Sequence, residues 1–246
     1  MIDILKERKT IRKYSDEDVS DDLLNEILEA GIRASTTGNM QVYSIVITRD
    51  RKMKEALAPL HFNQPMMMQA PVSLTFCADF NRFKKWCHNR NATPGYDNFL
   101  SFMTAAIDAI IVAQTVSIAA ESKGLGICYL GTAIYMAEKI IDVLNLPAGV
   151  VPVTTLTIGW PAEDPEQVDR LPLDGVIHRE TYADYTGEDI DRLYSEKESR
   201  DDSKQFITEN RKETLAQVFT DVRYKKSDNE TFSELLMNVL RKQGFM

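Results

Sequence analysis

The sequence predicts a layered domain in which helices cover strands, of the α/β or α+β class. Three short segments, 43–48, 72–78 and 151–158, are rich in β-branched and apolar residues, which is typical of buried strands. Between them, apolar residues recur at helical spacing. A chain that alternates these two kinds of element packs them in layers around a common core.

The helices are predicted from apolar spacing and from the residues at their ends. Ser20 precedes a run of helical spacing and is followed by two aspartates, so it is expected to cap a helix that reaches about residue 32. A short helix is expected over 51–60, and another over 136–144, which closes before Pro147.

The segment from Asn98 to Lys123 has almost no charged face, which predicts a core helix buried nearly all round, with Gly124 as its C-cap. Polar residues such as Asp108 interrupt its most apolar part, and that part is shorter than the roughly 20 apolar residues of a membrane span. We therefore expect a helix of the protein core.

The composition changes after Tyr182. Residues 188–205 are dense in charge, and helical spacing returns over 206–224 and 232–242. Because this tail has too few apolar residues for a core of its own, we divide the chain into a core, residues 1–181, and a C-terminal helical extension, residues 182–246. The extension is expected to pack on the core and on a second subunit.

The 246 residues include 29 basic and 37 acidic side chains, and the net charge of −8 disfavours nucleic acid as a partner. A small-molecule substrate fits better. No signal or transit peptide is visible, so we expect a cytoplasmic protein. Cys77, Cys87 and Cys128 lack CxxC spacing and are expected to be reduced and mostly buried, and no metal site is expected.

Three segments suit a phosphorylated, flat ligand. The basic cluster 8–13 offers guanidinium groups and a hydroxyl, as a phosphate monoester requires, although a solvated basic turn would have the same composition. The loop 35–41 is rich in hydroxyl and amide groups and is otherwise an ordinary turn. Gly131 would let a ring approach the backbone closely.

The spacing from Gly124 onward is GxGxxxxG after a helix, which does not fit a dinucleotide fingerprint. Since no GxSxG, HExxH or P-loop motif is present, a cofactor is expected to do the electronic work.

These segments resemble the nitroreductase family, in particular its larger, oxygen-insensitive NADPH nitroreductases and flavin reductases. The resemblance runs nearly end to end. The opening 8–14 is similar to the family's Arg-Arg-Ser-x-Arg type motif, and the stretch Phe-Cys-Ala-Asp-Phe-Asn-Arg at 76–82 is the most specific match. Residues 129–132, 159–161 and 170–172 resemble the family's flavin segment and the end of its core.

The resemblance implies the residues that bind the flavin. In the first cluster Arg8, Lys9, Thr10 and Arg12 would hold the phosphate and ribityl chain, with Arg170 as a second phosphate ligand. The other implied contacts, from the loop, the isoalloxazine side and the N5 segment, are Ser35, Thr36, Gln41, Gln64, Tyr129, Leu130 and Gly131. Two positions depart from the family pattern: Val168 replaces a lysine, and Thr132 stands where a second glycine is common.

The resemblance also implies a fold and an activity. The fold would be an α+β sandwich, a mostly antiparallel sheet wrapped by helices, with two chains forming a homodimer that shares two FMN sites. The activity would be that of an FMN-dependent NAD(P)H oxidoreductase, reducing nitroaromatics, quinones or free flavin by ping-pong hydride transfer. The flavin N5 would carry the chemistry, with no catalytic protein residue. A flavin-binding or sensory protein without nicotinamide-driven turnover, and a more specialised enzyme of the same family, remain as alternatives.

Overall fold

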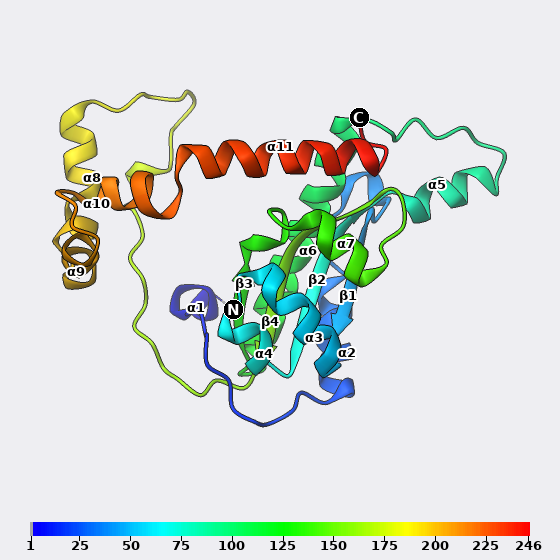
Figure 1. Ribbon diagram of the computed structural model, residues 1–246, viewed down its shortest axis with the longest axis horizontal. Helices are drawn as coiled ribbons and strands as arrows, with labels where there is room; N and C mark the ends of the chain where they lie inside the picture. The colour runs from blue at the N-terminus through cyan, green and yellow to red at the C-terminus, as the bar shows by residue number, and fades with distance from the viewer. Residues whose placement is uncertain (1) are drawn as a thin grey trace. The chain divides into compact units, whose positions relative to one another are not determined.

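The computed structural model describes residues 2–246 and has an α+β architecture built on one antiparallel sheet (Figure 1). Each neighbouring pair of strands is antiparallel. The order across the sheet is β1 (Tyr43–Thr48), β2 (Val72–Asp79), β4 (Val150–Gly159) and β3 (Gly126–Leu130). The expected α+β class and antiparallel sheet are confirmed, and the three predicted strands correspond to β1, β2 and β4.

The sequence does not predict the edge strand β3. Its side chains alternate between the two faces of the sheet, with Ile127 in one core cluster and Cys128 and Leu130 in the other. This period of two belongs to a strand, but five residues that begin at a glycine give only a weak signal. β3 is nevertheless the strand on which the candidate site is built.

Helices cover both faces of the sheet (Figure 1). Leu24 and Ile27 of α2 pack with α6 in the larger core cluster, on one face. Leu57, Met67 and Ile140, from α3, α4 and α7, form the smaller cluster on the other face. The bounds of these helices are α2 (Asp21–Gly31), α3 (Arg51–Leu57), α4 (Pro65–Gln69), α6 (Phe99–Ser122) and α7 (Ala137–Leu144). Shorter elements connect them: α1 (Ile2–Glu7), η1 (Thr37–Asn39), η2 (Ala58–His61), α5 (Asn81–His88) and η3 (Gly131–Ala133).

The helix ends follow the local sequence. The Ser20 hydroxyl accepts a hydrogen bond from the backbone N–H of Leu23 at 3.2 Å, as expected of an N-cap. The helix predicted over 51–60 divides into α3 and the 3₁₀ turn η2, whose second residue, Pro59, has no N–H to continue the α-helical ladder. α7 ends at Asn145, which adopts a left-handed conformation with φ of 51°.

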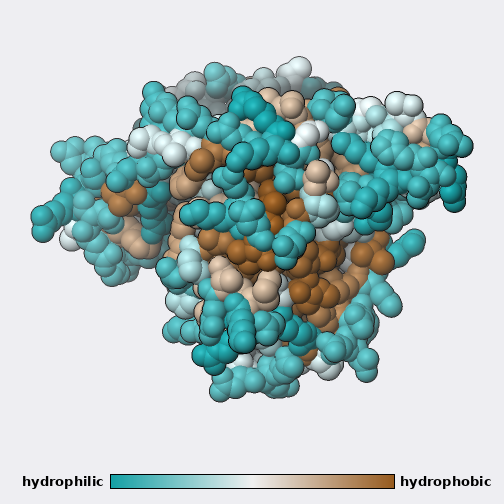
Figure 2. Space-filling model, turned by 45° about the vertical axis from the view of Figure 1, so that its right-hand side comes forward, coloured by the Kyte–Doolittle hydropathy of each residue, from teal (hydrophilic) through white to brown (hydrophobic). Residues whose placement is uncertain are grey.

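α6 corrects one expectation, because in this chain it is not buried all round. Its core-facing side, including Ala105, Ala109 and Val112, packs on the sheet. Its other side exposes a stripe of large apolar residues, which we call the α6 stripe: Phe99, Leu100, Met103, Ile107, Ile110 and Ile111. The helix is long and apolar enough to cross a membrane by length and composition, yet half of its most apolar window is buried inside the structure. Figure 2 shows that apolar surface gathers in contiguous patches between hydrophilic side chains.

The chain packs as two compact units. The first is the chain up to Glu166 together with Ser233–Met246, and the second is Gln167–Phe232. These bounds differ from the core (1–181) and extension (182–246) that composition suggests, and the packing of that extension on a second subunit stays a prediction. Within the first unit, Val239, Leu240 and Phe245 near the chain end are buried in the larger core cluster.

The second unit is helical and has a small core of its own. Leu193, Leu215 and Val218 are its buried apolar residues. Two of its helices begin with capping boxes, at Thr186 with Asp189 and at Thr214 with Gln217. Its elements are η4 (Leu173–Gly175), α8 (Gly187–Ser199), α9 (Asp201–Glu209), α10 (Leu215–Val218) and the π-helical turn η5 (Phe219–Arg223), while α11 (Lys226–Lys242) begins in this unit and ends in the first.

Candidate functional site

The basic cluster is fixed to the edge of the sheet. The backbone N–H of Ile11 donates to the carbonyl of Ile127 in β3 at 3.0 Å, and Thr10 forms a parallel bridge to the same residue. The Ile11 side chain is buried against Gly126, where an added Cβ would lie 2.6 Å from Ile11 atoms. The buried Tyr14 hydroxyl donates to the carbonyl of Ile11 at 3.0 Å. The segment is therefore held alongside β3 by an isolated bridge.

The cations of this cluster differ in their partners. Arg8 lies 3.3 Å from the Glu121 carboxylate of α6, and Lys9 pairs with Asp164 at 2.6 Å. Burial raises the pKa of Glu121, and the Arg8 guanidinium opposes that shift. Arg12 is exposed, and among residues 2–246 its guanidinium has no hydrogen bond or ion pair, so unlike Arg8 and Lys9 it is available to an anion.

The loop 35–41 is held in place by a buried carboxylate. Asp108, on the core-facing side of α6, accepts hydrogen bonds from the backbone N–H of Thr37 at 2.9 Å and from its hydroxyl at 3.1 Å. At the end of the loop the Arg82 guanidinium donates to the carbonyls of Gln41 and Tyr43, the latter at 3.2 Å. Gln41 itself is left-handed, with φ of 52°. Its side-chain amide donates to the Asn39 side chain at 3.1 Å.

Sequence reasoning does not identify Asp108 and Arg82 as supports of the site. Asp108 had a detectable signal, as a lone carboxylate inside an apolar helix, since a buried charge needs partners. Arg82 ends the stretch 76–82 that carries the most specific family match. Of the loop's predicted contacts, Thr36 is half-buried and Ser35 and Gln41 are exposed.

The end of β3 presents an open backbone surface. Leu130 is fully buried, and the Tyr129 hydroxyl lies within hydrogen-bonding distance of Ser117 at 3.0 Å, so both side chains are occupied by the fold. Gly131 is different, because a Cβ built there would meet nothing within 4 Å. Packing of the chain itself does not require a glycine at this position. The space beside Gly131 is available to a ligand.

Gln64 lies on a strained turn that contacts the end of β3. The two residues before it, Phe62 and Asn63, both have left-handed backbones, with φ of 54° and 53°. The preceding His61 is fully buried, and its Nδ1 lies 2.8 Å from the Thr132 hydroxyl, one residue beyond Gly131. The fold therefore brings together three predicted segments that are distant in sequence: the basic cluster, Gln64 and Tyr129–Gly131.

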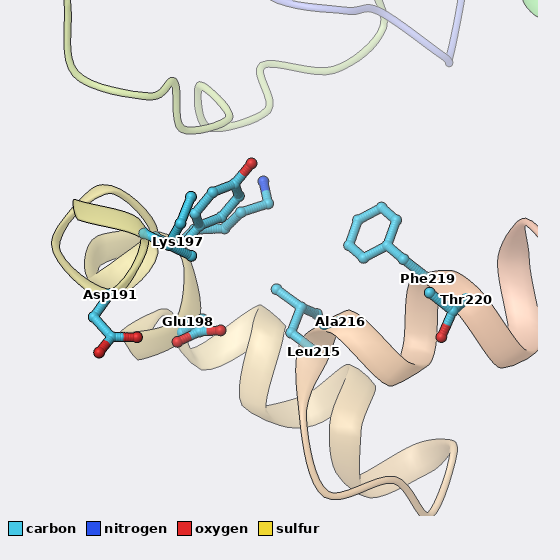
Figure 3. A pocket seen from close by; sticks show the side chains of 9 residues that line it. Asp191, Lys197, Glu198, Leu215, Ala216, Phe219 and Thr220 are labelled. Atoms are coloured by element: carbon cyan, nitrogen blue, oxygen red, sulfur yellow. The ribbon is translucent and has the colours of Figure 1, made fainter. Parts of the chain in front are cut away.

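Arg170 belongs to the second unit. Its guanidinium donates to the carbonyl of Asp169 at 2.8 Å, and the Asp169 carboxylate pairs with Lys197 at 3.0 Å. That unit also contains an open, mainly apolar pocket of about 570 Å³ between α8 and the α10–η5 segment (Figure 3). Tyr194 and Phe219 are among its lining residues. None of the residues that line it was predicted to bind the flavin.

The cysteines lie in the protein interior, as expected. Cys77, Cys87 and Cys128 are buried and unpaired by disulfides. Burial raises the pKa of the Cys77 thiol to about 12 and also raises the pKa of Cys128. Neither thiol is activated as a nucleophile at neutral pH.

Comparison with known proteins relates this geometry to one family. The sequence model of the nitroreductase family matches residues 5–160. The chain is 36% identical over 187 residues to an FMN reductase (NAD(P)H) of Bacillus subtilis, with 74% of each chain covered. It is 35% identical over 181 residues to an oxygen-insensitive NADPH nitroreductase of Salmonella typhimurium, again with 74% of each covered.

Solved structures agree with these sequence matches. A chain from Bacteroides fragilis is 61% identical, with a TM-score of 0.98 and 99% of each chain covered. The NADPH:FMN oxidoreductase of Vibrio harveyi, solved with NAD⁺, is 27% identical with a TM-score of 0.83, and the match covers 99% of this chain and 97% of that one.

The buried imidazole of His61 should make the protein less stable in acid. Burial lowers the pKa of His61 from 6.5 to about 4, so the unfolded chain binds a proton between these pH values that the folded chain excludes. The stability from the neutral ring is complete above pH 6.5 and is lost as the pH falls toward 4. Between pH 7.5 and pH 5.0 the free energy of unfolding should fall by about 2 kcal/mol more in the wild-type protein than in His61→Asn, which cannot titrate. Urea unfolding at both pH values measures this difference, and an equal fall in the two proteins would contradict it.

Proposed function

Because the chain belongs to the nitroreductase family, we propose that it is an FMN-dependent NAD(P)H oxidoreductase that reduces nitroaromatics, quinones or free flavin. One observation carries the proposal: the basic cluster is hydrogen-bonded alongside β3, and β3 ends at the open backbone of Gly131. A cation site and a flat, uncovered backbone surface therefore lie on the same sheet edge, as a phosphorylated ring cofactor requires.

The residues present suit FMN. The free guanidinium of Arg12 and the hydroxyl of Thr10 can bind a phosphate monoester, and we propose that Lys9, which pairs with Asp164 in the single chain, contributes to the same site. The open side of Gly131 accommodates the edge of a ring, and Gln64 offers an amide on the turn beside it. We propose the same role in cofactor binding for Arg8, Ser35, Thr36, Gln41, Tyr129, Leu130 and Arg170.

The chain's own residues have the task of binding and orienting. FMN, when bound, supplies a carrier that takes up hydride from a reduced nicotinamide and passes it to an oxidant. Arg12 and Thr10 fix the phosphate end, while Gly131 and Gln64 leave the ring face accessible. Asp108 holds the loop 35–41 and Arg82 holds its end, so these polar groups are in place before a ligand binds.

We further propose that the protein works as a homodimer in the cytoplasm, with small-molecule oxidants and without a nucleic-acid or membrane partner. The α6 stripe supports a second copy, because such a row of large exposed apolar side chains marks an interaction surface. The net charge of −8 disfavours nucleic acid.

The activity is tested with the purified protein and FMN under anaerobic conditions. We expect a yellow protein whose flavin absorbance bleaches on mixing with NADPH or NADH and returns when a nitroaromatic or quinone is added. A protein that takes up no FMN would falsify the proposed function. Uptake without bleaching would instead identify a flavin-binding protein without turnover.

Arg12→Ala should weaken FMN binding by about 1.5–3 kcal/mol, since a charge-assisted hydrogen bond to phosphate is lost. Titration of apoprotein with FMN, followed by quenching of flavin fluorescence, gives the two dissociation constants. Arg33→Ala, which removes another exposed arginine, should bind FMN like the wild type. Equal affinity in Arg12→Ala and the wild type shows that Arg12 is not a phosphate ligand.

Ile110→Glu should shift the protein toward monomers. Ile110 lies near the C-terminal end of the α6 stripe and is 51% exposed in the single chain, so a carboxylate there would be buried without a partner in a dimer. Ile110→Ala, which shortens the same side chain without adding charge, should remain dimeric. Sedimentation velocity separates the outcomes, and an unchanged mass for Ile110→Glu places the subunit contact elsewhere.

A further inference from the structure

His61 joins two segments that flank the proposed ring site. It is the last residue of η2, its side chain is 0% exposed, and its Nδ1 lies 2.8 Å from the hydroxyl of Thr132 in η3. The backbone N–H of Gln64 donates to the carbonyl of His61 at 3.1 Å. His61 therefore makes two contacts. Its backbone carbonyl binds the turn that carries Gln64, and its side chain binds the segment that follows Gly131.

The turn between His61 and Gln64 has an unusual backbone conformation. Phe62 and Asn63 are consecutive non-glycine residues in the left-handed region, a conformation that L-residues adopt only when their surroundings fix it. Phe62 is 51% exposed and stacks on Tyr135 with ring centroids 6.5 Å apart, whereas His61 before it is fully buried. The backbone N–H of Asn63 donates to the carbonyl of Ala58 at 2.9 Å, and the helix α4 that follows Gln64 is anchored by the buried Met67. To these contacts His61 adds a side-chain hydrogen bond that reaches directly from the turn to η3.

Thr132 is anchored from the opposite direction. Its carbonyl accepts the backbone N–H groups of Tyr135 at 3.1 Å and Met136 at 3.2 Å, which sets the turn that leads into α7. Thr132 is only 7% exposed, so its hydroxyl needs a partner inside the protein, and His61 supplies one. A glycine at this position would leave nothing for His61 to bind.

We propose that His61 is a positioning residue of the flavin site, which holds Thr132 through Nδ1 and thereby fixes the spacing between Gln64 and Gly131. This inference rests on the proposed function. His61 does not touch the cofactor in this proposal and acts only through the two segments that it joins.

The state of the ring is consistent with this role. The other nitrogen, Nε2, is buried and has no hydrogen-bond partner, so only Nδ1 connects His61 to Thr132. Burial lowers the pKa of His61 to about 4, which keeps the ring neutral at physiological pH. The connection therefore does not bring a charge beside the ring site.

The hydrogen bond between His61 and Thr132 can be tested with matched variants at both of its ends. In His61→Asn the side-chain amide occupies the place of Nδ1, whereas His61→Leu fills the cavity without a polar atom. Thr132→Ser keeps the hydroxyl, and Thr132→Val removes it with little change of shape. FMN dissociation constants, the visible absorption spectrum of bound flavin and the urea unfolding of each apoprotein are measured for all four variants and for His61→Leu/Thr132→Val.

We expect about tenfold weaker FMN binding and a shifted flavin spectrum in His61→Leu and in Thr132→Val, the scale of one lost buried hydrogen bond. Rescue is expected in His61→Asn and Thr132→Ser, with affinity within about threefold of the wild type. The double variant should be no weaker than either single variant, because both remove the same interaction.

Three outcomes would overturn the inference. The first is unchanged FMN affinity and flavin spectrum in His61→Leu and Thr132→Val together with lower apoprotein stability, because that result indicates a structural role only. His61→Asn could be as impaired as His61→Leu, or the losses in the double variant could add. Wild-type protein that takes up no FMN contradicts the proposed function itself, whereas wild-type protein that binds FMN alongside unaffected variants contradicts only the role of His61.

Discussion

The packing of Ile11 against the bare backbone of Gly126 is the contact on which the candidate site depends. A side chain at residue 126 would occupy the space that Ile11 fills, so the amino-terminal segment could not approach β3 closely enough for its hydrogen bond to Ile127. Because the hydrogen bond of Ile11 and the bridge at Thr10 hold this backbone beside β3, the side chains on either side of Ile11 acquire defined positions. An apolar contact at the sheet edge thereby decides where Thr10 and Arg12 lie.

Much of the fold could be predicted because its signals are local. Ser20 forms the expected cap, and β1, β2 and β4 lie where β-branched residues gather. The pattern of β3 is too short to predict a strand, and the exposure of the α6 stripe is unpredictable for a different reason. An apolar composition indicates that a helix face is covered. It does not indicate whether the same chain or a second chain covers that face.

The segments that form the candidate site could be predicted from the sequence, whereas most of the contacts between them could not. Family resemblance indicates the segments around residues 8–12, 35–41 and 129–131, whereas the distinction between Arg8 and Arg12 arises only in three dimensions. Arg8 pairs with Glu121, which is distant in sequence, while Arg12 has no such partner in the described chain. His61 gave no sequence signal as a positioning residue, since a lone histidine is indistinguishable from any other core histidine until its neighbour is known.

α6 connects the separate parts of this arrangement. Its core-facing side carries Asp108, which holds the loop 35–41, and near its end Glu121 meets Arg8. Its opposite side carries the α6 stripe. A rigid helix cannot shift one face without the other, so whatever covers the stripe also restrains the two carboxylates. In the proposed dimer, the subunit contact and the carboxylate that holds the loop 35–41 therefore lie on the same helix.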